Sequence, residues 1–88
     1  MISRLRVIGH SMEPILHDGD YVIVHRFTSP KLSDIVAAKI DGKILIKRIV
    51  KIADGKYFLS GDNQHDKKIY VAGKHQIMGK LFLRVKRR

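Results

Sequence analysis

The chain contains no cysteine, which excludes disulfide bonds, thiolate zinc sites and a cysteine nucleophile. It also has no long hydrophobic run, because its purely apolar stretches fall far short of the ~20 residues of a membrane-spanning helix. Arg4 and Arg6 interrupt the only candidate hydrophobic segment of a signal peptide. The sequence as given therefore predicts a soluble protein, either cytoplasmic or peripheral to a membrane.

Acidic residues are scarce. Asp and Glu number 8 against 18 Lys and Arg, which leaves a formal net charge of +10. Such an excess favours an anionic partner, namely nucleic acid, an anionic membrane surface or an acidic protein. Basic residues are concentrated at 83–88, which we interpret as a basic tail that is either solvated and disordered or in contact with a membrane.

A length of 88 residues predicts a single domain over 1–88. Runs rich in β-branched and aromatic residues alternate with turn sequences such as Asp41-Gly42 and Asp54-Gly55. These runs predict strands at 5–8, 20–25, 34–40, 43–53, 56–59, 69–71 and 76–85, with a bulge or bend at Gly79. Only the residues just after Ser11 are suited to a short helical turn. We expect an all-β fold, a small folded-over sheet or partly open barrel of about six to seven short strands.

The longest predicted strand, 43–53, carries cations among apolar neighbours. Alternation places Arg48 and Lys47 on opposite faces. We expect the even-numbered face, from Ile44 to Ile52, to be a core face, so that Arg48 needs a carboxylate partner. Lys47 lies between Leu45 and Ile49, an environment that disfavours a charged amine. The alternative is a lysine whose amine reaches solvent.

Ser11 lies in a loop with unusual backbone requirements. Gly9 permits conformations that other residues resist, and Pro14 fixes its own φ angle. Ser11 is therefore either an ordinary turn or cap serine or a nucleophile held on a shaped loop. A serine hydroxyl needs a base to take its proton, and a neutral lysine such as Lys47 can be that base.

The histidines offer little chemistry. The chain has 5 of them, and none shows the HxxxH or HxxEH spacing of a metal site. His10 adjoins Ser11, so a Ser-His arrangement is a lesser alternative to Ser-Lys. We therefore predict no metal site and no cofactor, with surface positions for His10, His17, His25, His65 and His75.

Several segments resemble boxes of the signal peptidase I and SOS-repressor-like serine peptidases. The nucleophile box is matched by 9–16 (GHSMEPIL) followed by 18–20 (DGD), and the general-base box by 46–50 (IKRIV). Residues 33–36 (SDIV) resemble the family's Gly-Asp-Ile-Val, and 61–63 (GDN) resemble a box typical of the signal peptidase branch. Gly79-Lys80 followed by an apolar strand fits the family's final segment. Order and spacing agree across nearly the whole chain.

The resemblance implies a serine endopeptidase that cleaves a precursor or propeptide segment of another protein next to small residues. Ser11 would be the nucleophile, and its backbone N–H would stabilise the oxyanion. Lys47 would be the general base. Met12 would pack beside the serine and shape the substrate groove, and Asp62 would pair with Arg48 to support the lysine strand.

Other features depart from the family pattern. Residues 64–70 (QHDKKIY) replace the serine and Asp-Ser-Arg usual in signal peptidases, and Gly9 occupies the position of a serine that some of them use as a second oxyanion donor. The sequence shows neither the membrane anchor and inserted β-domain of that branch nor the repressor branch's DNA-binding domain and self-cleaved segment. It therefore resembles a minimal soluble catalytic core.

Two alternatives stay open, a small basic β-barrel that binds nucleic acid and a catalytically inactive peptidase-like domain. Nucleic acid is the less favoured partner, because the three Tyr and three Phe are not interleaved with basic residues as stacking platforms would be. The expected partners are a protein or peptide substrate and an anionic membrane surface or membrane protein. The sequence predicts no oligomeric state.

Overall fold

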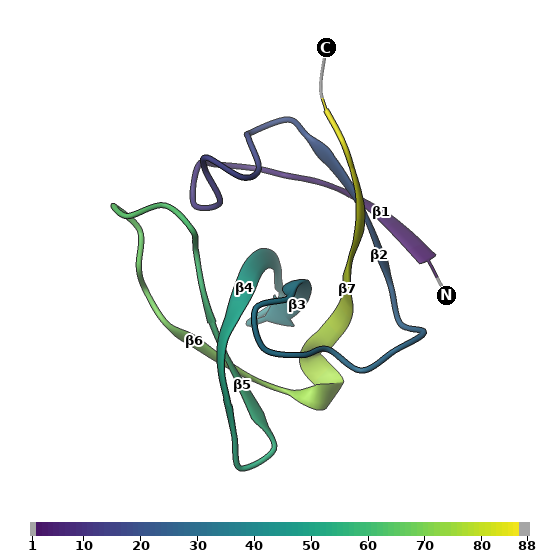
Figure 1. Cartoon of the computed structure of the whole chain (residues 1–88), viewed down its shortest axis with the longest axis vertical. Coiled ribbons are helices and arrows are strands. Elements are labelled where there is room, and N and C mark those ends of the chain that lie inside the picture. The colour runs from purple at the N-terminus through teal and green to yellow at the C-terminus, as the bar shows by residue number, and fades with distance from the viewer. Residues whose placement is uncertain (1, 87–88) are drawn as a thin grey trace.

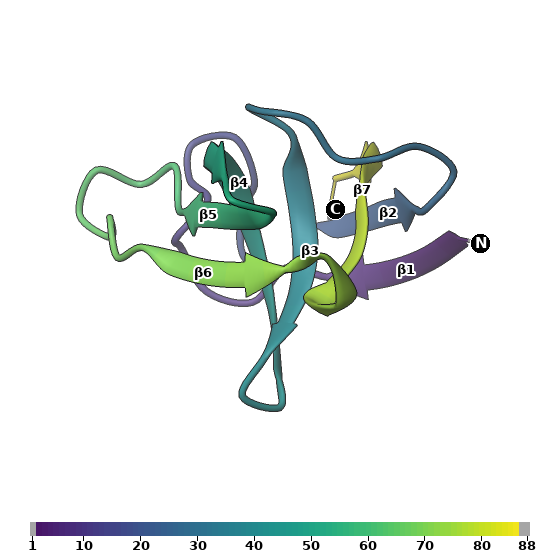
Figure 2. The ribbon, with the colours of Figure 1, turned by 90° about the horizontal axis from the view of Figure 1, so that it is seen from below.

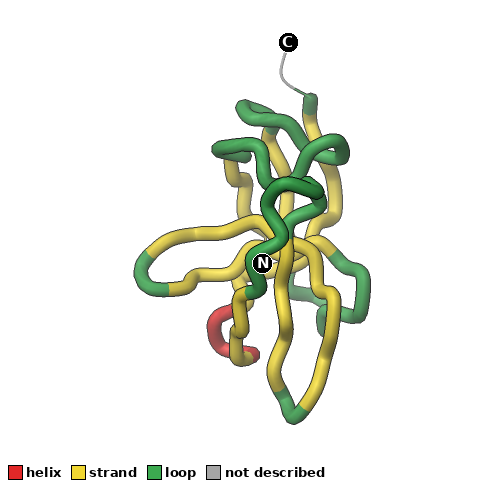
Figure 3. Tube along the Cα trace, turned by 90° about the vertical axis from the view of Figure 1, so that its left-hand side faces the viewer, coloured by secondary structure: helices red, strands yellow, loops and turns green. Residues whose placement is uncertain are grey.

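The computed structural model describes residues 2–86 and has the all-β fold that the sequence predicts. Strands dominate the trace, and helix is confined to one short turn before the last strand (Figure 3). The elements are β1 (Ile2–Arg6), β2 (Tyr21–His25), β3 (Ile35–Ile40), β4 (Lys43–Ala53), β5 (Lys56–Ser60), β6 (Tyr70–Gly73), the 3₁₀ turn η1 (Lys74–Gln76) and β7 (Ile77–Val85).

All strands belong to one seven-stranded antiparallel sheet in the order β1-β2-β7-β3-β4-β5-β6. The sheet is open, with β1 and β6 at its edges, and it folds over itself (Figure 1). Figure 2 shows β3 in the centre, with β1 and β2 to one side and β5 and β6 to the other. The strand that pairs with both β4 and β7 therefore forms the middle of the molecule.

The folded sheet encloses two hydrophobic clusters that share β3. The first contains Val7, Met12, Leu16, Val22, Val24, Ile35 and Ala37. The second contains Val36, Ala38, Ile49, Leu59, Ala72 and Ile77. Successive residues of β3 point to opposite faces of the sheet, so this strand contributes to both clusters and is buried on both sides.

Strand β1 lies earlier in the chain than the predicted strand 5–8. Its outward residues Arg4 and Arg6 alternate with the inward, half-buried Ser3 and Leu5, a pattern that a search for apolar runs overlooks. Ile8 follows the strand and is 84% exposed. The helical turn expected after Ser11 is a single hydrogen-bonded turn, in which Leu16 N–H donates to Met12 O at 2.9 Å.

Strand β7 confirms the strand predicted at 76–85 to within one residue, and it corrects the interpretation of 83–85 as tail. Residues 83–85, placed in a basic tail by the sequence, belong to the sheet because Leu83 and Val85 pair with Ile23 and Tyr21. Residues 87 and 88 lie outside the described part of the chain. The register shifts of β7 fall between its pairs at positions 81 and 83 and between those at 77 and 79. The second shift adjoins Gly79, where the sequence predicts a bulge or bend. Gly79 also allows a close approach, since a Cβ there would lie 2.8 Å from His25 O.

The expectation that the even-numbered face of β4 is a core face is wrong for most of the strand. Ile44, Val50 and Ile52 are 44–47% exposed, whereas Lys47 and Ile49 are 5% and 1% exposed. The cause is the pairing of β4 with its neighbouring strands. Lys47 lies opposite Val36 and Ile49 lies opposite Leu59, and Val36 and Leu59 both belong to the second cluster. A register shift between Ile49 and Lys51 then interrupts the alternation.

Candidate active site

The Ser11 loop connects β1 to β2, and its apolar residues pack into the first hydrophobic cluster. Met12 and Leu16 are both 1% exposed in the first cluster, while Ser11 itself is half-buried. Gly9 has a φ of 91°, in the region that favours glycine, and its N–H donates to Asp18 Oδ1 at 2.8 Å. The loop is therefore fixed by the hydrogen bond between Gly9 and Asp18 and by the packing of Met12 and Leu16.

Lys47 lies in the middle of β4 with almost its whole surface covered. Its side chain extends toward β6, where Nζ is 5.4 Å from the centroid of the Tyr70 ring. Lys68 Nζ lies 4.9 Å from the centroid of the same ring. Within residues 2–86, the Lys47 amine has no carboxylate partner and no hydrogen bond to protein.

Ser11 and Lys47 line the same cleft, which has a volume of about 450 Å³. One side of the cleft consists of residues 5–12 and another of residues 44–47 at the start of β4, with Asp66 also at its wall. In the part of the chain that the structure describes, no hydrogen bond joins the Ser11 hydroxyl to the Lys47 amine. Such bonds are often long in free enzymes and shorten only when substrate is bound.

The segment Gly61-Asp62-Asn63 docks directly against the Ser11 loop. Asn63 donates twice, from its backbone N–H to Ser11 O at 2.8 Å and from Nδ2 to His10 O at 2.9 Å. A Cβ on Gly61 would lie 2.4 Å from Ser11 O, so only glycine permits this approach. The loop and the end of β5 are thus in backbone contact.

Asp62 connects the same segment to the lysine strand. Its carboxylate accepts from Arg48 Nε and Nη2, both at 2.8 Å, in a two-pronged ion pair. Arg48 Nη1 also donates to Ser33 O at 2.8 Å. The hydrogen bond that Arg48 donates to Asp62 raises the pKa of Arg48, so this guanidinium is charged at any physiological pH. The structure contains the Arg48–Asp62 pair that the resemblance implies.

His10 is engaged away from the serine. Its Nδ1 lies 2.6 Å from Glu13 Oε2, and this hydrogen bond is the main cause of a raised His10 pKa. No His10–Ser11 side-chain bond exists within 2–86, so the Ser-His arrangement has no support from the geometry. Among the same residues, no group of three or more His, Cys, Asp or Glu is arranged to hold a metal ion.

Sequence reasoning missed two residues of this site. From the sequence, Asn63 was identified only as part of the Gly-Asp-Asn segment. Its short polar side chain was the feature that could have indicated a hydrogen bond to the Ser11 loop. Tyr70 gave no signal, because its position over the Lys47 amine depends on the pairing of β6 with β5.

A family model described as Peptidase S24-like matches residues 3–82. The chain belongs to the peptidase S24-like family. The fold class and the family resemblance read from the sequence are therefore confirmed.

Curated relatives of this S24-like chain are named LexA repressor. The one from Frankia alni is 42% identical over 60 residues, which cover 67% of this chain and 23% of that protein. The one from Thermotoga maritima is 33% identical over 78 residues, or 88% of this chain and 40% of that protein. The one from Streptomyces coelicolor is 43% identical over 60 residues, or 67% and 25%. The S24-like chain thus spans less than half the length of these relatives.

These comparisons do not test several of the expectations drawn from the sequence. Cleavage of another protein, a signal-peptidase-like specificity and a membrane partner stay predictions. The expectation that nucleic acid is an unlikely partner has no support from relatives that are named repressors. Among residues 2–86, no helix of the S24-like chain has the length and apolar character needed to cross a bilayer.

Proposed function

We propose that this S24-like chain is a serine peptidase in which Ser11 is the nucleophile and Lys47 the general base. The observation that carries the proposal is the shared cleft, which brings a half-buried serine from the β1–β2 connection to a buried lysine from mid-β4. The Lys47 amine lines the same cleft as Ser11 and has no carboxylate partner within residues 2–86, so it is suited to act as the base for this serine. The rest of the machinery supports this pair.

The cleft suits an extended peptide. Within residues 2–86, positions 43–47 of β4 pair only with β3, because the pairs with β5 begin at Arg48. Strand β1 is an edge strand, and the residues that follow it form the opposite wall. A substrate segment can add its backbone to these unpaired edges, as in β-strand addition. Ile8 and Ile44, 84% and 47% exposed, are available to contact its side chains.

The chemistry follows from the placement of these groups. Ser11 Oγ attacks the scissile carbonyl carbon as its proton passes to Lys47 Nζ, and that proton then goes to the leaving amine. Water then attacks the resulting ester as its proton passes to Lys47 Nζ, and Lys47 gives that proton to Ser11 Oγ as the acid product leaves. Within 2–86, the backbone N–H of Ser11 donates to no protein acceptor, so it is free to stabilise the oxyanion. Gly9 N–H is already bonded to Asp18 and is not a second donor.

We further propose that the substrate is a precursor or propeptide segment of another protein, cleaved next to small residues. This finer proposal rests on the resemblance of the Gly61-Asp62-Asn63 segment to a box typical of the signal peptidase branch. Met12, which lines the cleft and also belongs to the first cluster, would form part of the groove floor.

The test is to incubate the protein with cell lysate and membranes and to map new amino termini by mass spectrometry. We expect new termini with the native chain and none with Ser11→Ala or Lys47→Met. Ser3→Ala and Lys51→Met are matched controls, because Lys51 is exposed on the same strand as Lys47. Both controls should cleave as the native chain does.

Folding is monitored in parallel. Lys47→Met should be at least as stable as the native chain toward urea, because methionine fills a similar volume without burying an amine. New termini that persist with Ser11→Ala would contradict the proposal. So would the absence of new termini with the native chain. Loss of activity in Lys51→Met to the same extent as in Lys47→Met would remove the special role of Lys47.

A further inference from the structure

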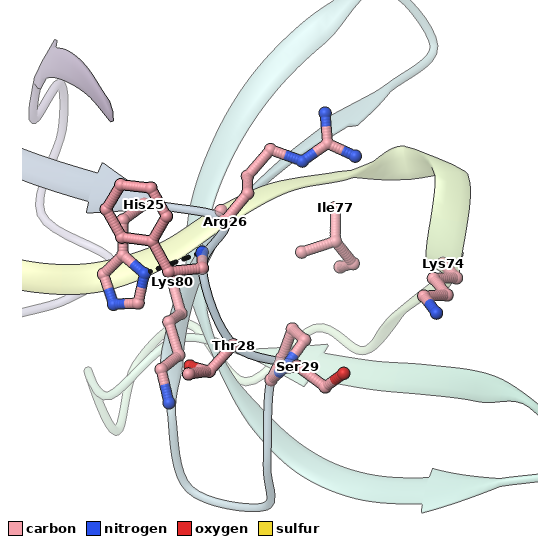
Figure 4. A pocket seen from close by; sticks show the side chains of 10 residues that line it. His25, Arg26, Thr28, Ser29, Lys74, Ile77 and Lys80 are labelled. Carbon is pink, nitrogen blue, oxygen red and sulfur yellow. Dashed lines mark hydrogen bonds between the residues drawn. The ribbon is translucent and has the colours of Figure 1, made fainter. Parts of the chain in front are cut away.

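A second cavity, of about 220 Å³, lies where the loop after β2 meets the start of β7 (Figure 4). It is lined by His25, Arg26, Phe27, Thr28, Ser29, Pro30, Lys74, Ile77, Gly79 and Lys80. None of these residues lines the Ser11–Lys47 cleft. The cavity therefore has no part in the proposed peptide hydrolysis.

The lining of this cavity is cationic. Figure 4 shows Arg26, Lys74 and Lys80 around it, with the hydroxyl-bearing Thr28 and Ser29 along one side. No carboxylate lines the cavity; Lys80 Nζ reaches Asp34 Oδ2 at 3.3 Å. Arg26 and Lys74 have no ion-pair partner among residues 2–86. Uncompensated cations beside hydroxyl groups are suited to a compact anionic group such as a phosphate.

An exposed aromatic cluster adjoins the cavity. The His25 and Phe27 rings stack with centroids 5.4 Å apart, and the His25 and Phe82 rings meet edge to face at 5.6 Å. Phe27 and Phe82 are 67% and 64% exposed, which is unusual for phenylalanine in so small a protein. His25 Nδ1 accepts from the Phe27 N–H at 3.1 Å, which fixes the orientation of the stack.

We propose that this surface, formed by His25, Arg26, Phe27, Lys74, Lys80 and Phe82, binds single-stranded nucleic acid. A phosphate occupies the cavity, and unpaired bases stack on Phe27 and Phe82. Binding of single strands without sequence preference uses this combination of a basic groove and exposed aromatic rings. The fold brings together aromatic and basic residues that are dispersed in the sequence, which is why their spacing along the chain argued against such a site.

Other occupants fit less well. A second copy of the chain in a twofold arrangement would bring this surface against itself, and among residues 2–86 Arg26 and Lys74 have no carboxylate to balance them. A bilayer would bury the two phenylalanine side chains, but its binding does not depend on a concave, hydroxyl-lined cavity. A DNA duplex keeps its bases stacked and does not offer them to Phe27 and Phe82.

The experiment measures the fluorescence anisotropy of a labelled oligothymidine with the full chain, at several salt concentrations. Phe27→Ala and Phe82→Ala should each weaken binding about fivefold or more. Lys74→Gln should reduce the slope of log affinity against log salt by about 0.7, the amount for one lost phosphate contact with a single strand. Ile52→Ala and Lys56→Gln, exposed changes on β4 and β5, should have no such effect.

Heparin separates a binding site from a general attraction of a +10 protein for polyanions. Phe27→Ala should leave heparin affinity unchanged, because heparin has no bases to stack. Equal losses for heparin and oligothymidine would overturn the proposal. So would binding to phosphatidylserine vesicles without oligothymidine binding, or concentration-dependent self-association that Phe82→Ala abolishes. Ser11→Ala should bind oligothymidine normally, so this result is independent of peptidase activity.

Discussion

At the scale of single residues, the site depends on which groups have partners. Arg48 is bonded to Asp62 and Ser33, and His10 to Glu13. The Lys47 amine has no hydrogen bond or ion pair among residues 2–86, and it lies 5.4 Å from the centroid of the Tyr70 ring. Of these three side chains, Lys47 is therefore the one without a carboxylate partner, which supports its proposed role as the base.

The His10–Glu13 pair makes a prediction about pH. The pKa of His10 is raised above its ordinary 6.5 by the hydrogen bond to Glu13. NMR titration of the native chain should therefore give a His10 pKa above 6.5. Because the folded-state pKa is raised, the pair stabilises the fold fully below the unfolded value of 6.5. That contribution is lost as pH rises through the folded-state pKa.

Glu13→Gln should lower the His10 pKa and remove the corresponding pH dependence of the unfolding free energy. Asp54→Asn, which removes one negative charge at the distant β4–β5 turn, is the control and should leave His10 unaffected. A His10 titration that is identical in the native chain and in Glu13→Gln would contradict the assignment of Glu13 as the main cause.

At the scale of elements, the segment after β5 links the Ser11 loop to strand β4. Gly61 makes the close approach, Asp62 accepts from Arg48, and Asn63 donates to His10 and Ser11. Three consecutive residues therefore contact the Ser11 loop and the strand that carries Lys47. The relative position of Ser11 and Lys47 should be as rigid as this short segment.

Gly61→Ala tests that link. The added Cβ would meet Ser11 O at 2.4 Å and Asp66 O at 3.0 Å, both backbone atoms that cannot rotate away. We expect a loss of about 1–3 kcal/mol in unfolding free energy, measured by urea denaturation, and NMR shift changes centred on the Ser11 loop. Gly73→Ala is the control, because its Cβ meets only side-chain atoms, those of His75 at 3.1–3.2 Å and Gln76 Oε1 at 3.8 Å. Equal stability of the Gly61→Ala and native chains would show that the segment is not tightly docked.

At the scale of the whole molecule, β3 makes the two hydrophobic clusters one folding unit. Ile35 and Ala37 belong to the first cluster, and Val36 and Ala38 to the second. Neither cluster can lose its packing without exposing a strand that the other one needs. The halves of the sheet should therefore unfold together.

Leu16→Ala in the first cluster and Leu59→Ala in the second should each destabilise the whole chain by about 2–5 kcal/mol, because both side chains are almost fully buried. Far-UV circular dichroism and tyrosine fluorescence should give coincident urea transitions in both variants. Leu83→Ala, at a 52% exposed position, should cost much less. Separate transitions in Leu59→Ala would show that the second cluster unfolds independently.

The sequence by itself determined most of the strands and the Ser11 loop, because alternation, Asp-Gly turns and glycine at Gly9 are local properties of neighbouring residues. The first strand is the exception, since it lies earlier in the chain than predicted. The sequence also predicted which residues carry chemistry, since a serine loop and a lysine strand are visible in the order of residues. Only the tertiary structure decided which face of β4 is buried, since that depends on the pairing of Lys47 with Val36. The contact of Asn63 with His10 and the gathering of Phe27, Phe82 and Lys80 likewise join segments far apart in the chain. Local patterns carry no record of such contacts, because they arise from the way the sheet folds over β3.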